Sequence, residues 1–65
     1  MIVDDVDVPQ DLVDQLGEVY AESGVWIWLR SRHRQLDMSR PIDLIRDGRI
    51  EEVRAVADYL TGGAW

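Results

Sequence analysis

The chain contains no cysteine, and this absence most narrows what its 65 residues can fold into. A chain of this length buries only about 60% of the surface that its unfolded form exposes, and many small domains add disulfides or a metal ion to offset that deficit. Neither a disulfide nor a thiolate zinc site can form here, and a single histidine, His33, removes the other common zinc arrangements. We therefore expect one small domain without a metal or other cofactor, whose core is built from a few large side chains.

Apolar spacing and the positions of Gly and Pro predict an all-α fold, a small single-domain bundle of about four short helices with no sheet. The expected helices lie near residues 9–22, 24–31, 40–47 and 49–61. The first begins at Pro9, whose fixed φ suits a first helical turn. The last has the clearest apolar stripe, from Ile50 to Leu60, and Gly62 or Gly63 ends it.

Residues 1–8 are expected to form an acidic, flexible lead-in to a helical domain over residues 9–65. Their apolar residues Ile2, Val3 and Val6 alternatively form a short strand if a partner supplies an edge. Charge divides unevenly along the chain, because residues 1–25 hold seven acids and no base. The other forty residues hold all seven Arg and six acids, so the two parts are electrostatically complementary.

Four Arg residues lie between positions 30 and 40, ahead of a segment that resembles a helix-turn-helix unit. Against DNA binding, Glu51 and Glu52 would lead the recognition helix, where carboxylates repel phosphate, and the net charge is −6. We expect no nucleic-acid binding by the chain alone and favour ion pairs within the fold. The expected pairing joins an Arg set to an acidic set, namely Arg30, Arg32, Arg34 and Arg40 with Asp11, Asp14, Glu18 and Glu22.

The sequence offers no catalytic constellation. His33 lies between two Arg residues and is expected to be an exposed loop side chain, and no glycine-rich phosphate loop occurs. No stretch approaches the roughly 20 apolar residues of a membrane span, and the acidic N-terminus lacks the features of a signal peptide. We therefore expect a non-enzymatic, cytoplasmic protein that does not associate with membranes.

The order of short motifs from Val25 to Trp65 resembles the toxin-binding domain of Xre/MbcA/ParS-type antitoxins. The matching positions are Trp28-Leu29, Leu36, the run RPIDLI from Arg40 to Ile45, Gly48, Val53 and Leu60. The resemblance implies a module that binds and blocks a RES-domain toxin, a protein that acts on NAD. It also implies that the blocking part is the exposed face of the last helix with the tail. Only about 25 residues precede the motifs, so we expect the chain to lack the family's DNA-binding domain.

The predicted partner-binding residues therefore gather at the C-terminal end of the chain. They are Arg49, Arg54, Tyr59, Gly62, Gly63 and Trp65. Two glycines give the tail conformational freedom, so its terminal Trp can enter a concave pocket of a partner. We expect these residues at the interface because Trp and Arg are enriched at interface hot spots. The Arg side chains on the last helix are expected to pair with acidic groups at the rim of that pocket.

Two further Trp residues leave a choice open, because Trp26 and Trp28 are either core or a second interface. The small size of the domain also favours self-association into a homodimer. An alternative function of a different class is a small phage or regulatory protein. Such a protein would bind a DNA-binding protein or nucleic acid and use its acidic first helix as a charge mimic.

Overall fold

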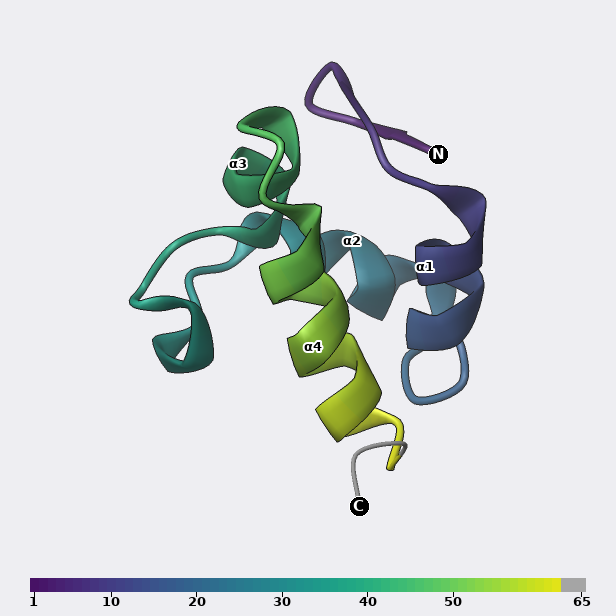
Figure 1. Ribbon diagram of the computed structural model, residues 1–65. Coiled ribbons are helices and arrows are strands. Elements are labelled where there is room, and N and C mark those ends of the chain that lie inside the picture. Colours follow the sequence, from purple (N-terminus) through teal and green to yellow (C-terminus); the bar gives the residue numbers. More distant parts are fainter. Residues whose placement is uncertain (63–65) are drawn as a thin grey trace.

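A computed structural model describes residues 1–62 and shows four α-helices with a short N-terminal hairpin (Figure 1). The elements are β1 (Ile2–Val3), β2 (Val6–Asp7), α1 (Gln10–Leu16), α2 (Glu22–Arg30), the 3-10 helix η1 (Arg34–Leu36), α3 (Pro41–Arg46) and α4 (Ile50–Leu60). The four expected helices are confirmed. The expectation of no sheet is wrong, so the fold is mostly helical rather than all-α.

The hairpin is closed by two consecutive Asp residues. β1 and β2 are antiparallel, with Val3 opposite Val6, and the turn residues Asp4 and Asp5 have φ of 49° and 65°. Two consecutive left-handed residues match the right-handed twist of the paired strands, and Asp tolerates this conformation better than most residues. The acidic pair is thus a turn and not part of an unstructured run.

The hairpin lies near the N-terminus in Figure 1, and its apolar side chains pack onto the helices. Val3 and Val8 are fully buried and Val6 nearly so, which makes all three part of the core. The expectation that residues 1–8 form a lead-in outside the domain is therefore wrong. No partner edge is needed either, because the two strands pair with each other.

Two helix boundaries differ from expectation. α1 ends at Leu16 because the chain turns at Gly17, and Val19 from the expected stripe is 47% exposed. α2 begins at Glu22, two residues before the expected start at 24, and the preceding Ala21 is in extended conformation. An acidic residue in the first turn of α2 complements the helix dipole.

The core draws buried apolar side chains from both strands and every helix. They are Val3, Val6, Val8, Leu12, Leu16, Val25, Trp28, Leu29, Leu36, Ile42, Leu44, Val53 and Ala57. α4 packs against α3, α1 and η1, and it joins α3 through Gly48, whose φ of 78° fits the expected inter-helix turn. Among the described residues, no helix combines the length and apolar character that a membrane span needs.

Candidate partner-binding surface

One flank of α4 is tied to α1. Arg54 donates from Nη1 to Oδ2 of Asp11 at 2.8 Å, and Gln15 donates to Oδ1 of Asp58 at 2.6 Å and to the Thr61 hydroxyl at 3.2 Å. The Arg54 guanidinium holds the pKa of Asp11 below its usual value, and the Asp11 carboxylate raises the pKa of Arg54. Arg54 was expected to project freely toward a partner, but it already joins two helices.

The opposite flank of α4 faces η1 and is more open. Arg49 forms a bidentate pair with Glu52, with Nε to Oε2 at 2.6 Å and Nη2 to Oε1 at 3.0 Å, and this hydrogen bonding lowers the pKa of Glu52. One residue before the end of the helix, Tyr59 is 67% exposed. A groove of about 300 Å³ lies beside it, lined by Gln35, Ala55, Val56 and Tyr59.

The six predicted residues are therefore only partly brought together. Tyr59 lines the groove toward η1 near the C-terminal end of α4, Arg49 lies at the N-terminal end of the same helix, and Arg54 lies on the flank toward α1. Gly62 follows α4 with a φ of 77°. Gly63 and Trp65 lie outside the described residues.

The two internal Trp residues take different positions. Trp28 is 6% exposed and stacks on His33, with ring centroids 4.7 Å apart and planes at 29°. The His33 Nε2 atom also lies 2.8 Å from the Trp28 carbonyl oxygen, so this histidine packs on the core and is not merely an exposed loop side chain. Trp26 is half-buried, and the exposed large apolar side chain of α2 is Ile27, which is 66% exposed.

The groove beside Tyr59 was missed at the level of sequence. Ala55 and Val56 lie three and four residues before Tyr59, so helical spacing alone places them on its side of α4. The contribution of Gln35 carried no such signal, because η1 follows a polar loop and reaches α4 only through the tertiary fold. Within the loop, Leu36 is buried and holds η1 in place.

Several Arg residues form ion pairs within the fold, but among the described residues none of the pairings expected between the two sets forms, so that expectation is wrong. Arg30 contacts Asp4 at 3.1 Å, and Arg40 contacts both oxygens of Asp43 at 2.9 and 3.0 Å. This bidentate contact lowers the pKa of Asp43. Of the four acids expected to pair, only Asp11 has an ion pair among the described residues.

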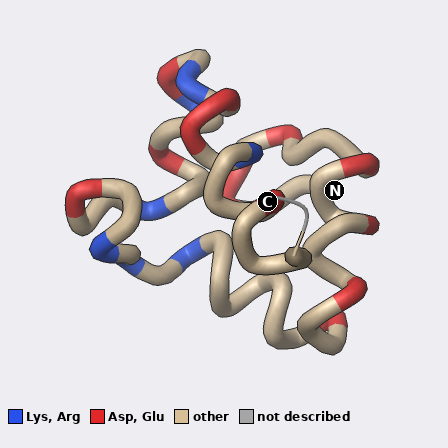
Figure 2. The backbone as a smooth tube through the Cα atoms, turned by 60° about the horizontal axis from the view of Figure 1, so that its bottom comes forward, with Lys and Arg blue, Asp and Glu red and all other residues tan. Residues whose placement is uncertain are grey.

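The resulting charge distribution is uneven in space as well as in sequence. In Figure 2 the N-terminal part of the chain carries acidic positions and no basic ones. Most Arg positions lie on the opposite side of the molecule. Within residues 1–62, no group of three or more His, Cys, Asp or Glu side chains is arranged to hold a metal ion. The fold and surface thus define a small, mostly helical domain with an exposed aromatic groove on its last helix.

Comparison with known proteins shows sequence similarity to antitoxins. The chain is 39% identical over 56 residues, 86% of its length, to a Mycobacterium tuberculosis protein named "Probable mycobacterial cidal antitoxin Rv3188". It is 33% identical over 54 residues, 83% of its length, to proteins named "Mycobacterial cidal antitoxin MbcA" from Mycobacterium bovis and Mycobacterium tuberculosis. The matches cover 49% and 48% of those proteins, so the chain spans about half the length of the curated relatives it matches.

These names support an antitoxin family for the chain. No family model matches the sequence, and no solved structure does.

Proposed function

We propose that the chain is the toxin-binding part of an antitoxin and that its target is a RES-domain toxin that acts on NAD. The observation that carries this proposal is sequence similarity over 86% of the chain to a protein named as a cidal antitoxin. In this role the chain is a non-enzymatic cytoplasmic inhibitor that acts through a protein–protein contact. The RES-type target and the blocking mechanism rest on the motif resemblance from Val25 to Trp65.

The proposed contact surface is the flank of α4 that faces η1, together with the tail that follows. Tyr59 exposes most of its ring beside the groove of about 300 Å³, and exposed Tyr next to a small apolar hollow is typical of an interface anchor. Arg49, which forms a bidentate contact with Glu52 at the N-terminal end of α4, is the cationic contact in this proposal. In this proposal the segment that follows α4, including Trp65, is the part that enters the active-site cleft of the toxin.

Co-expression tests the proposal. A RES-domain toxin encoded in the same genome is induced in a bacterial host with and without the chain, and growth, cellular NAD and co-purification are measured. We expect the toxin to lower NAD and stop growth, and the chain to restore both and to co-purify with the toxin. The RES-type target would be refuted if the toxin depleted NAD as strongly with the well-expressed chain as without it and the two proteins did not co-purify.

Two variants test the surface. Tyr59→Ala is expected to weaken toxin binding about tenfold or more, because it removes an aromatic anchor. Ile27→Ala is the matched control, since Ile27 is equally exposed but lies on α2. Removal of residues 62–65 is expected to leave helical content unchanged and to weaken binding by a similar factor. Equal affinity of all three variants would place the contact elsewhere.

A further inference from the structure

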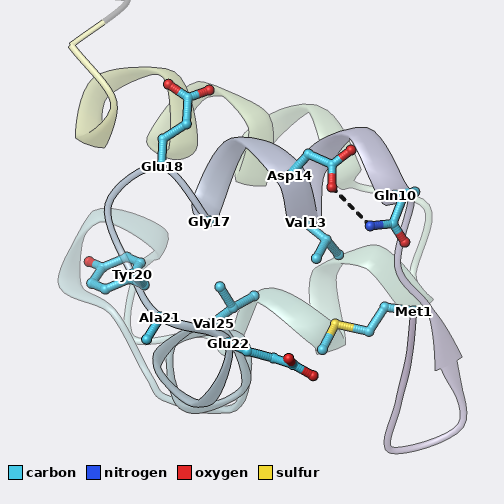
Figure 3. A pocket seen from close by; sticks show the side chains of 10 residues that line it. All are labelled: Met1, Gln10, Val13, Asp14, Gly17, Glu18, Tyr20, Ala21, Glu22 and Val25. Atoms are coloured by element: carbon cyan, nitrogen blue, oxygen red, sulfur yellow. Dashed lines mark hydrogen bonds between the residues drawn. The ribbon is translucent and has the colours of Figure 1, made fainter.

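A second, larger groove lies between α1 and α2 (Figure 3). Its volume is about 640 Å³, within the range of about 300 to 1,000 Å³ that is typical of ligand sites in proteins. It runs from Met1, beside the hairpin, to Tyr20 in the turn between the two helices. None of its lining residues comes from α4, so it is separate from the surface described above.

The floor of this groove is apolar. In Figure 3 the side chains of Val13 from α1 and Val25 from α2 point toward one another, and Met1 extends toward them from the hairpin side. Val13 and Met1 remain partly exposed, whereas Val25 is buried below them. The helices thus leave between them a hollow where apolar side chains of another molecule can lose contact with water.

The walls of the groove are acidic. Asp14 lies on the α1 wall and Glu22 on the α2 wall, and neither forms an ion pair with a described residue. Asp14 accepts one hydrogen bond, from Gln10 at 2.9 Å. Glu18 is a third lining acid, but its side chain points away from the hollow in Figure 3.

The cations that could neutralise these walls are engaged elsewhere. The Met1 ammonium, at one end of the groove, donates to the Val8 carbonyl oxygen at 3.1 Å and lies 4.0 Å from Oδ1 of Asp7. Residues 1–25 contain no basic side chain, and the Arg residues that reach the N-terminal part are Arg30, paired with Asp4, and Arg54, paired with Asp11. The groove therefore combines an apolar floor with negative walls that the fold leaves uncompensated within the described residues. An acidic occupant would be repelled by these carboxylates. A purely apolar occupant would remove them from water without supplying an opposite charge.

We infer that this groove binds an amphipathic helix of a partner protein whose apolar face carries Leu-like side chains and whose flanking positions carry Lys or Arg. The apolar side chains lie over Val13 and Val25, and the cations reach Asp14 on one wall and Glu22 on the other. A helix fits because its apolar residues recur on one face and its long basic side chains extend to both sides. The site does not depend on the proposed toxin contact, so each can fail alone.

Designed peptides of about 18 residues provide the probes, at a length that supports a helix. One has Leu at i, i+3, i+4 and i+7 with Lys elsewhere, one replaces every Lys by Glu, and one scrambles the Leu/Lys order so that no apolar face forms. Binding to the full chain is followed by amide chemical shifts in NMR. We expect the Leu/Lys helix alone to bind, with the largest shifts in residues 13–25 and with affinity that falls as salt rises.

Variants of the chain distinguish binding in the groove from nonspecific attraction between opposite charges. Asp14→Asn and Glu22→Gln are each expected to weaken binding about two- to fivefold, and Val13→Thr, which keeps the side-chain shape, to weaken it as well. Glu51→Gln is the matched control, because it removes the same charge from an exposed, unpaired position on α4.

Three results would overturn the inference, the first two of which concern the chain. One is chemical-shift changes centred outside residues 13–25, and the other is equal weakening by Glu51→Gln and the groove variants. Binding of the scrambled peptide as tightly as the amphipathic one would likewise show charge attraction without a groove. Unchanged amide spectra of the free variants serve as the check that each remains folded.

Discussion

Truncation of Val3 to Ala tests whether the N-terminal hairpin belongs to the core. Val3 is fully buried in the cluster that also contains side chains from every helix. The change removes two carbon atoms, worth about 0.8 kcal/mol each in transfer free energy, and leaves a cavity that adds to the cost. We therefore expect the free energy of unfolding to fall by about 1.5 to 3 kcal/mol. A domain of this size has a total stability of about 3 to 10 kcal/mol, so the loss is large.

Urea unfolding followed by circular dichroism at the helix band measures this change. With a slope of about 1 kcal/mol per molar urea, the midpoint is expected to drop by about 1.5 to 3 M, while the slope itself stays unchanged. Ile2→Ala is the matched control, because Ile2 is the neighbouring residue of the same strand and is 59% exposed. The control is expected to change stability by less than about 0.5 kcal/mol.

The reasoning fails if the two variants have the same midpoint as the unmodified chain. In that case the hairpin would not be docked on the helices, and residues 1–8 would be the flexible lead-in that the acidic sequence suggests. A large effect of both variants would also contradict the structure, because only one of the two side chains is buried.

Three further outcomes are expected. Gly48→Ala should destabilise the chain by about 1 kcal/mol because its φ is 78°, whereas Gly17→Ala, at a φ of −65°, should be neutral or stabilising; thermal unfolding compares them. The contact with Arg54 lowers the folded-state pKa of Asp11 below 3.8, so it stabilises the fold above that pH and the stabilisation is lost as pH falls through 3.8 and below. Asp11→Asn should therefore make acid unfolding shallower, and an unchanged profile would contradict the assignment. Titration with random duplex DNA at physiological salt should show no micromolar binding, because the net charge is −6.

The helices were predictable where local signals agree. α3 begins at Pro41 and α4 has a repeating apolar stripe, so their observed bounds lie within one residue of those expected. α1 was extended too far because Val19 and Tyr20 continue the 3.6-residue period in the sequence. In the structure the chain turns at Gly17 instead, and this turn brings α2 back against α1.

The hairpin was not predictable from apolar spacing, because strands of two residues are too short to show alternation. Its signal was the Asp4-Asp5 pair between two short apolar runs, which is compatible with a two-residue turn. That signal is weak, since Asp-rich segments are more often solvated. The burial of Val3 and Val8 decides the outcome, and burial depends on helices that come later in the chain.

The separation of Arg54 from the other predicted contact residues follows from the spacing of these residues along α4. Successive residues of an α-helix are rotated by about 100°, so Arg54, five residues from both Arg49 and Tyr59, lies about 140° around the helix from each of them. A side chain rotated that far points toward a different flank of α4, and the positions between Arg54 and Tyr59 on the helix surface are the exposed Glu51, Ala55 and Asp58. The structure fills that position with the Asp11 contact to α1. Arg54→Ala should therefore loosen the packing of α4 on α1 and leave binding at the Tyr59 flank nearly unchanged, unless the partner reaches both flanks.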